Sequence, residues 1–426
     1  MMHIPSMKEI TKRRNIGTIK EPDLLLVPLL ERFGVRPQPT VGIGDKVGKY
    51  QVIGQASEGF SGKVHSPVSG TVENMGQVEQ LDGTMSLTVF IRNDHKCSEI
   101  SLSSSKGDEM LPEDILKKIE DAGIVGLGGA QFPTAMKYNR KGRRVDTFII
   151  NGAECEPYLT SDYTLMSQHT EELFQGIILA DRVLEAGQIV IAVENSNREL
   201  EKVMRPFLDK YEKIRLQVVP DQYPQGGELQ LAKTIGKVEI PKGMVPIEKG
   251  VVVSNVGTVI AIYDAVVNGR PLIERVITVS GEMVQNPGSY CVLVGTPISH
   301  IIEHFGIDMG EGVVVAGGPM MSPQVTNPDA PIHKGTLGII ALGKKQIDRM
   351  NCIWCGYCAD VCPMKLMPMK YDELYRKGKI ARMANYNLTD CIECAACEYI
   401  CPSNVPLIRS IKEGKAKLKT LKDAAR

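Results

Sequence analysis

Two cysteine runs near the C-terminal end constrain this chain more than any other feature of its sequence. The first run extends from Cys352 to Pro363 and the second from Cys391 to Pro402. Both have the spacing C-x2-C-x2-C-x3-C-P, and together they hold eight of the eleven cysteines. Four cysteines at short, repeated intervals in each run predict that this part of the chain folds around bound metal.

The spacing is typical of bacterial ferredoxins that carry two [4Fe–4S] clusters. In that pattern, the first three cysteines of a run bind one cluster and the fourth binds the other cluster. The predicted ligands of the first cluster are Cys352, Cys355, Cys358 and Cys401. Those of the second cluster are Cys391, Cys394, Cys397 and Cys362.

Zinc and disulfide bonds are the alternatives for these cysteines. Thiolates also bind zinc, but a structural zinc site usually takes two C-x2-C pairs and does not need the final x3-Cys-Pro. A disulfide framework is disfavoured in a long chain whose first residues, Met1–Lys8, contain no apolar signal segment. We expect the isolated Cys97, Cys155 and Cys291 to be structural.

Length and charge limit the class of protein. A chain of 426 residues can form two to four domains. Its 50 basic and 50 acidic residues cancel, which gives no support for nucleic acid as the main partner. The longest apolar window, 251–267, is interrupted by polar residues and is too short to span a bilayer. We expect a cytoplasmic protein that is soluble or peripheral on a membrane.

The first domain, residues 1–102, is predicted to be β-rich. Short apolar runs between about 24 and 93 are separated by Gly, Pro and Asp. The phrases Gly44–Val47 and Ser66–Val72 resemble the barrel-sandwich hybrid of biotinyl and lipoyl carrier domains. A carrier needs a lysine at the hairpin tip, which segment 64–70 does not provide. We therefore expect a structural or docking domain.

A short linker over 103–108 is predicted to lead into an α/β domain over 109–265. Buried strands are expected at 147–151, 188–193 and 215–219, and helices at 112–121, 171–186 and 198–211. This alternation indicates a mostly parallel sheet covered by helices.

Two further units are predicted. Residues 270–322 suggest a small β-rich unit with one helix. That helix carries His300 and His304, but no third ligand is nearby, so we do not expect a metal site there. Residues 345–426 are predicted to be the ferredoxin-like unit, with a basic tail from Lys412. We expect the tail to be a solvated, frayed helix rather than a contact with a membrane or an acidic partner.

Two such clusters need a source of single electrons. Nicotinamide cofactors transfer hydride, which carries two electrons at once. A flavin is the usual converter between two-electron and one-electron transfer. The candidate flavin loop is Gly126-x-Gly128-Gly129, because glycines let backbone N–H groups approach a phosphate or ring. Gln131 replaces the last glycine of G-x-G-x-x-G, and no strand directly precedes the loop. From the residues alone, a tight turn before a helix is an equal alternative.

A family resemblance favours the flavin. Gly126–Thr134 with Lys137 resembles the G-x-G-G-A-G-F-P-T…K loop of two related subunits. One is the flavin-bearing, NADH-oxidising subunit of respiratory complex I, and the other is the C subunit of the Rnf ion-translocating NAD:ferredoxin oxidoreductase. Further segments similar to theirs are Asn151–Tyr158, Gly226–Leu229 and Asn255–Thr258.

The Rnf C subunit is the closer resemblance, and it covers nearly the whole chain. It shares the twin cysteine runs, the Gly317–Met321 phrase and an N-terminal segment, His3–Thr11. The likeness implies that 270–322 is a soluble-ligand-binding β-grasp (SLBB) domain. It also implies FMN and NADH as cofactors beside the two clusters.

The resemblance implies a role for each site residue. The Gly126, Gly128 and Gly129 backbone and Lys137 would hold the FMN phosphate and ring. The residues that would line the flavin are Asn151, Glu154, Glu228, Asn255 and Thr258. Phe132 would stack on the nicotinamide or adenine, and Glu156 would hydrogen-bond to the dinucleotide. Gln131 stands where the family has glycine; a positive φ there would cost on the order of 1 kcal/mol.

The function implied is an electron-entry subunit. Electrons from NADH would pass through FMN and the clusters to membrane-bound partners and a ferredoxin, coupled to Na⁺ or H⁺ movement on the cytoplasmic face. One alternative is a soluble relative that feeds a dedicated reductase of the proline reductase or cobalamin reductase type. The other is a flavin-less adaptor that relays electrons through its clusters.

Overall fold

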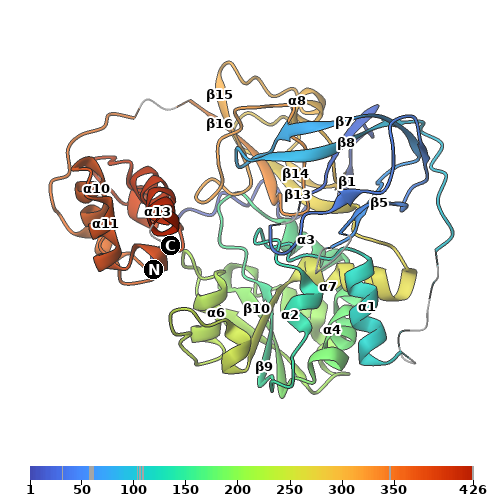
Figure 1. The fold of residues 1–426 in the computed structure, drawn as a ribbon. Helices are drawn as coiled ribbons and strands as arrows, with labels where there is room; N and C mark the ends of the chain where they lie inside the picture. Colours follow the sequence, from blue (N-terminus) through green and yellow to red (C-terminus); the bar gives the residue numbers. More distant parts are fainter. Residues whose placement is uncertain are drawn as a thin grey trace.

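The computed structural model describes residues 1–30, 32–56, 62–102, 104, 107, 110–344 and 347–424. Four units follow one another along the chain: two β-rich units, an α/β unit between them in sequence, and a helical C-terminal unit (Figure 1). The N-terminus lies beside the helical unit in the same view. The predicted linker at 103–108 and the predicted boundary at 345 fall mostly outside the described residues.

The N-terminal unit consists of two small antiparallel sheets that enclose an apolar core. The first sheet has the order β2-β8-β7-β4, with β2 at Leu24–Pro28, β4 at Lys46–Val47, β7 at Gly70–Glu79 and β8 at Met85–Asn93. The second contains β3 at Gln38–Pro39, β5 at Val52–Gln55 and β6 at Val64–His65. Leu25, Ile53 and Ile91 are fully buried between them.

The α/β unit is built on a four-stranded parallel sheet with the order β11-β10-β9-β12. The strands are β9 at Thr147–Gly152, β10 at Gln188–Glu194, β11 at Ile214–Val219 and β12 at Val251–Asn255. The longer helices are α1 at Pro112–Asp121, α4 at Thr170–Leu184 and α5 at Leu200–Leu208. The shorter helices are α2 at Thr134–Tyr138, α3 at Ser161–Gln168, α6 at Glu228–Thr234 and α7 at Val256–Tyr263.

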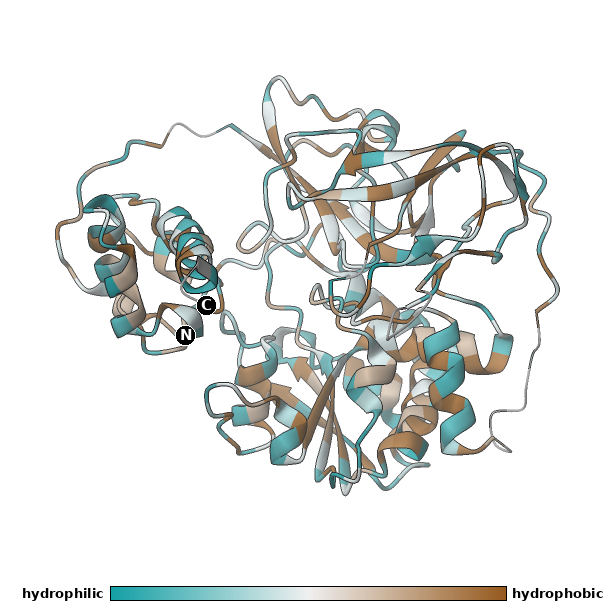
Figure 2. Cartoon of the chain, in the orientation of Figure 1, coloured by the Kyte–Doolittle hydropathy of each residue, from teal (hydrophilic) through white to brown (hydrophobic). Residues whose placement is uncertain are grey.

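Buried apolar strands explain why this sheet forms. Figure 2 shows hydrophobic residues along its strands, as expected for a parallel sheet covered by helices. The predicted strands and helices of this unit are present, with ends that differ by up to three residues.

The strand order creates a switch point beside β9. From β9 the chain adds β10 and then β11 on one side, and it later returns to place β12 on the other side. The register pairs Asn151 at the end of β9 with Asn255 at the end of β12. In open α/β sheets, ligands bind outside the carboxyl ends of the strands at such a point.

The second β-rich unit contains a five-stranded sheet with the order β1-β14-β13-β16-β15 and helix α8 at Ile298–His304. The strands are β1 at Gly17–Thr18, β13 at Glu274–Ser280, β14 at Gly288–Leu293, β15 at Gly312–Ala316 and β16 at Gly338–Gly343. The sheet therefore takes β1 and β16 from outside 270–322, because sheet neighbours need not be close in sequence. His300 Nε2 lies 2.7 Å from the Lys20 carbonyl oxygen.

The C-terminal unit is helical. Its helices are α9 at Tyr357–Asp360, α10 at Pro368–Arg376, α11 at Ile380–Met383, α12 at Ala396–Tyr399 and α13 at Leu407–Ala424. The expectation of a solvated, frayed tail is wrong, because α13 packs against α10 and α11 with Ile411 and Leu418 buried. Gly414 allows the close approach, since a Cβ there would lie 2.5 Å from Met383 Cε.

Short non-α segments complete the chain. They are the 3-10 segments Asn195–Asn197, Pro246–Lys249, Ala384–Tyr386 and Leu388–Asp390 and the π-helical segment Asp264–Asn268. Within the described ranges, no helix has both the length and the apolar character that crossing a membrane requires.

Candidate functional site

Two asparagines anchor the loops at the switch point. Asn151 Nδ2 donates to the Gly226 carbonyl at 2.9 Å, and its Oδ1 accepts from the Ala153 N–H at 3.1 Å. Asn255 Oδ1 caps α7 by accepting from the Gly257 N–H at 2.9 Å, and Asn255 Nδ2 donates to Asp162 Oδ2 at 2.7 Å. Each side chain thus ties its own loop to a neighbouring one.

The glycine loop after α1 closes on itself next to Asn255. The Gly126 N–H donates to the Phe132 carbonyl at 2.9 Å, and the Gln131 N–H donates back to the Gly126 carbonyl at 3.0 Å. The Leu127 N–H donates to Thr258 Oγ1 at 2.8 Å, which fastens the loop to α7.

The tip of this loop can hold an anion. Gly129 has a φ of +99°, and a Cβ on Gly128 would lie 3.4 Å from Asn255 Cβ. Among the described residues, the N–H groups of Gly128, Gly129 and Ala130 have no protein acceptor, and Gly128 and Ala130 are exposed. Successive backbone N–H groups in such a turn bind phosphate groups, so the loop suits the FMN phosphate.

Gln131, which stands where the related loop has glycine, adopts a left-handed backbone conformation. Its φ is +55°, in the left-handed region that favours glycine. The side chain is buried against Gly335, where a Cβ would lie 2.6 Å from Gln131 Cδ. Within the described part of the chain its Nε2 has no hydrogen-bond partner. The side chain therefore points into the protein and leaves the loop tip open.

Two other predicted site residues form a pair beside the loop. Lys137 on α2 and Glu228 at the start of α6 form an ion pair of 2.6 Å.

Phe132 packs on Phe33 of the N-terminal unit, with ring centroids 5.0 Å apart at 56°. The aromatic face predicted for a nicotinamide or adenine is thus next to a second ring.

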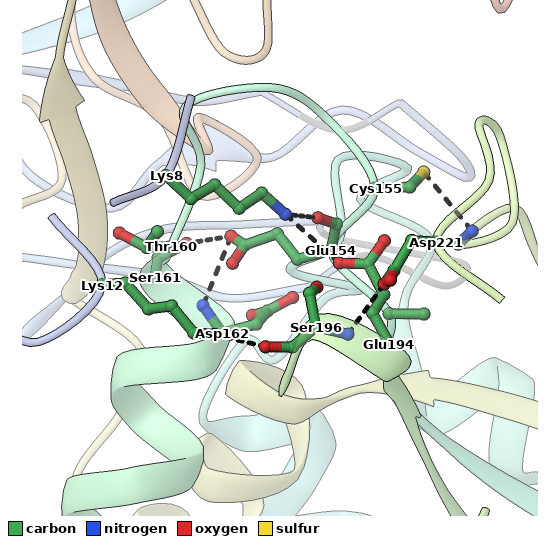
Figure 3. A network of polar contacts seen from close by, with 12 residues as sticks. Lys8, Lys12, Glu154, Cys155, Thr160, Ser161, Asp162, Glu194, Ser196 and Asp221 are labelled. Atoms are coloured by element: carbon green, nitrogen blue, oxygen red, sulfur yellow. Dashed lines mark hydrogen bonds and ion pairs between the residues drawn. The ribbon is translucent and has the colours of Figure 1, made fainter. Parts of the chain in front are cut away.

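Glu154 lies at the centre of a buried polar network (Figure 3). Its Oε1 accepts from Ser161 Oγ at 2.9 Å and from the Asp162 N–H at 3.3 Å. Lys8 donates to the Glu154 carbonyl and lies 3.3 Å from Glu194 Oε2. Glu154 Oε2 is buried without a partner among the described residues. An unpartnered buried oxygen at this place suits a ligand that donates a hydrogen bond.

Burial shifts the acidity of these groups. It raises the pKa of Asp162 to about 8, and the neighbouring Glu154 adds to the shift. It also raises the pKa of Glu154, against the opposing charge of Lys8. Burial lowers the pKa of Arg275 to about 10; this guanidinium donates to the Leu127 carbonyl at 3.2 Å. Asp162 is therefore the group of this network whose pKa lies closest to neutral pH among those with a resolved value.

Glu156 is held by protein donors. Its Oε2 accepts from the Met320 N–H at 3.0 Å, and its Oε1 accepts from the Met321 N–H at 3.1 Å. Tyr223 Oη lies 3.4 Å from Oε1. Burial raises the pKa of Glu156 to about 7. Its suggested hydrogen bond to a dinucleotide stays a prediction.

Sequence reasoning did not select Asp162, Arg275, Tyr223 or Glu194. Asp162 follows Glu154 by eight residues, which is a local signal. The others come from distant segments, and no spacing in the sequence points to them. Lys8 belongs to the N-terminal segment that supported the family resemblance, but it had no role there.

The cysteines surround two small cavities. Cys362, Cys391, Cys394 and Cys397 line one cavity, which we call the inner cluster site. Cys352, Cys355, Cys358 and Cys401 line the other, the outer cluster site. The structure thus brings the fourth cysteine of each run to the first three of the other run. Among the described residues, no three His, Cys, Asp or Glu side chains converge on a single-ion site.

The backbone repeats around the two sites. Positive φ values occur at matching distances from the cysteines, in the pairs Trp354 and Glu393, Gly356 and Ala395, and Lys365 and Asn404. The Trp354 N–H donates to Cys352 Sγ and the Glu393 N–H to Cys391 Sγ, both at 3.4 Å. Such N–H donors stabilise thiolate charge, so both sites suit [4Fe–4S] clusters.

Fold and sites define a class: an electron-transfer flavoprotein with a ferredoxin-type unit. Family models match in the same order along the chain. They are the RnfC barrel sandwich hybrid domain at residues 2–96, the Nuo51 FMN-binding domain at 119–264, the SLBB domain at 276–324 and the 4Fe-4S dicluster domain at 351–405. The predicted fold class and its β-grasp unit are confirmed.

The particular family follows from the relatives. The chain is 38% identical over 426 residues to the C subunit of the ion-translocating oxidoreductase complex of Rhodobacter capsulatus, covering 98% of this chain and 82% of that protein. It is 35% identical over 434 residues to the protein of the same name from Edwardsiella ictaluri, covering 100% of this chain and 54% of that protein. The chain belongs to this family, the C subunits of ion-translocating oxidoreductase complexes, although it spans about half the length of the Edwardsiella relative.

A solved structure shares the fold. The chain is similar to a crystal structure of NAD⁺-reducing [NiFe]-hydrogenase in the H₂-reduced state, with a TM-score of 0.51 and 19% identity. The match covers 74% of this chain and 61% of that chain.

Proposed function

We propose that this chain is the electron-entry subunit of an ion-translocating oxidoreductase complex, in which NADH is oxidised, or NAD⁺ reduced, next to FMN. The observation that carries the proposal is the position of the inner cluster site against the flavin-type α/β unit, where Tyr223 Oη donates to the Cys394 carbonyl at 2.7 Å. When bound, FMN accepts a hydride and releases single electrons.

The α/β unit supplies the FMN site in this proposal. The N–H groups of Gly128 and Gly129 bind the phosphate. Lys137, on the helix that follows the loop, is paired with Glu228 and contacts the phosphate once it leaves that ion pair. Asn151, Asn255 and Thr258 keep the loops in place, and Glu154 Oε2 accepts a hydrogen bond from the ligand. Phe132 offers its ring face to the nicotinamide or adenine.

The two cluster sites act in order. The inner site is buried against the α/β unit, and Lys242 adds an ion pair of 3.0 Å to Asp390, just before Cys391. At the outer site, Cys355 is exposed, and Ile353 and Trp354 are 65% and 56% exposed. Electrons therefore enter at the inner site and leave at the outer site.

The partner receives electrons at the outer site. We expect other subunits of a membrane complex at the cytoplasmic face, with ferredoxin as the final exchange partner. Exposed apolar and aromatic side chains, including Trp354 and Tyr357, suit a protein interface.

An anaerobic titration tests this function. The purified protein should show flavin and iron–sulfur absorbance, and both should bleach when NADH is added. Iron–sulfur bands without flavin bands, and no response to NADH, would leave only a relay adaptor. Co-purification with membrane subunits supports a role in the ion-translocating complex. Co-purification with a soluble reductase would instead indicate that the chain supplies electrons to that reductase.

A further inference from the structure

Three units of the fold meet around Glu156 and Tyr223. Glu156 belongs to the loop after β9, Met320 and Met321 belong to the second β-rich unit, and Tyr223 bridges to the helical unit through Cys394. The segment Gly317–Met321 has no role in the electron path proposed above. At this junction, however, it contacts the Glu156 side chain through Met320 and Met321.

The phrase forms a cradle for the carboxylate. Two successive N–H groups, those of Met320 and Met321, each donate to a different Glu156 oxygen. Gly318 allows this approach, because a Cβ there would lie 2.3 Å from Glu156 Oε2. The cradle fixes Glu156 so that Oε1 is directed at the Tyr223 hydroxyl.

Tyr223 is also held in place. It is 2% exposed, and its backbone pairs with Met2 through hydrogen bonds of 3.1 Å and 2.7 Å. Around it, Ile4, Ile392 and Ala396 form an apolar cluster. In such surroundings a hydrogen bond is electrostatically stronger than in water.

The Tyr223 hydroxyl has one proton and two neighbours that can accept it. The Cys394 carbonyl is 2.7 Å away and Glu156 Oε1 is 3.4 Å away. The proton therefore points to Cys394, and its partial positive charge stabilises extra negative charge in the inner cluster site. Hydrogen bonds to the cluster sulfurs tune cluster potentials, and so do outer-shell groups that orient a ligand; Tyr223 acts in the second way, through the Cys394 carbonyl.

We propose that Tyr223 is a positioning residue for electron transfer: its hydroxyl, placed between Glu156 and the Cys394 carbonyl, tunes the reduction potential of the inner cluster and couples it to the loop after β9. The proposal rests on the proposed function in one respect, that the inner site holds a [4Fe–4S] cluster. It needs neither FMN nor NADH.

Opposite shifts are expected from two variants. Tyr223→Phe removes the donor to Cys394, so the reduced form of the inner cluster loses stability. At a fixed potential its reduced-to-oxidised ratio should fall several-fold; a tenfold fall corresponds to about 59 mV for one electron. At about pH 8, above the pKa of about 7 of Glu156, Glu156→Gln removes the competing negative charge, so the ratio should rise.

The measurement is an anaerobic titration of the full chain with dithionite and mediators, followed by electron paramagnetic resonance. Cys355→Ser, which removes an outer-site ligand, identifies the inner signal. Tyr138→Phe is the matched control, because Tyr138 is also fully buried and its hydroxyl has one bond, to Ser254 Oγ at 2.8 Å. This control should leave the inner potential unchanged.

A double-variant cycle separates the coupling from general damage. If Glu156 acts through Tyr223, the shift from Glu156→Gln should at least halve in the Tyr223→Phe background. Equal inner potentials in Tyr223→Phe and Tyr138→Phe would overturn the proposal. If the Tyr223→Phe protein does not assemble the inner cluster, the Glu156→Gln variant decides instead. An inner-cluster potential equal to that of the wild type would then overturn the proposal. Normal resonance signals of both clusters without these shifts in the inner potential would contradict only the role of Tyr223. If the wild-type protein shows no cluster signals, the proposed function is contradicted as well.

Discussion

The inner and outer cluster sites have the same local design and opposite surroundings. The cysteine spacing, the positive φ positions and the N–H to Sγ bonds repeat between them. Yet Trp354 of the outer site is 56% exposed, whereas Cys394 of the inner site is buried beside Tyr223. Ligand geometry follows from local sequence, but the place of a site in an electron path follows from what packs against it.

The largest effect should come from removing one ligand of each site. With Cys394→Ser, NADH should no longer reduce the outer cluster, because the path is broken at its entry. With Cys355→Ser, NADH should still reduce the inner cluster, while transfer to a partner is lost. Cys97→Ser, an exposed cysteine far from both runs in sequence, is the control. Electron paramagnetic resonance spectra after NADH addition measure all three variants. Equal behaviour of Cys394→Ser and Cys355→Ser would contradict the distinction between an inner entry site and an outer exit site.

The next largest effect should come from the glycine loop that we propose as the FMN phosphate site. Gly129→Val places a β-branched residue at a φ of +99°, which costs about 1–2 kcal/mol and should weaken FMN binding roughly tenfold. Gly83→Val introduces the same kind of strain, at a φ of +78° in the N-terminal unit, and should leave FMN affinity unchanged. Fluorescence titration with FMN measures both. Equal affinities in the two variants would argue against the loop as the phosphate site.

A smaller effect is expected at the outer face. Trp354→Ala should slow electron transfer to a partner by about tenfold, since buried aromatic anchors contribute about 2 kcal/mol or more at interfaces. Tyr211→Ala, in the α/β unit, is the control. Stopped-flow transfer to co-purified partner subunits measures the rate. The inner cluster should be reduced by NADH as before; a change there would mean that Trp354 supports folding rather than docking.

The pH dependence of stability tests the buried network. Because burial raises the pKa of Asp162 to about 8, the native chain keeps a proton that the unfolded chain loses above about pH 4. Stability should therefore fall as pH rises from about 4 to 8. Asp162→Asn should flatten this slope, and the exposed Asp209→Asn should not. Apparent melting temperatures between pH 5 and 9 measure it, and parallel curves for wild type and Asp162→Asn would contradict the assignment.

The smallest effect should come from the ion pair beside the inner site. Lys242 is exposed and Asp390 is half-buried, so Lys242→Ala should cost at most about 1 kcal/mol. Inner-cluster reduction by NADH should slow by a factor of about five or less, and added salt should reduce the difference. Lys377→Ala removes an ion pair inside the helical unit, to Glu373, and should not alter the rate. A salt-independent loss would point to a structural role for Lys242.

Local patterns predicted much of the fold. The strand at Thr147–Gly152 and the helix at Pro112–Asp121 follow from apolar runs and an N-terminal proline. The cysteine sets follow from spacing. The sequence did not predict that β16 belongs to the second β-rich unit, because strand pairing over long separations has no local signal.

The same limit applies to the sites. Asn151 and Asn255 lie at the ends of β9 and β12, Thr258 lies in the first turn of α7, and the family resemblance selected all three. Lys8 and Tyr223 act through partners more than 140 residues away, Glu154 and Cys394. Such contacts depend on how the units pack together, which spacing within one segment does not encode.

The order of reduction tests the central claim most directly. The protein is mixed with NADH, frozen at successive times, and its two cluster signals are followed by electron paramagnetic resonance. The inner cluster, identified with Cys355→Ser, should become reduced before the outer cluster. Reduction of the outer cluster first, or reduction of the outer cluster by NADH in Cys394→Ser, would contradict the proposed path.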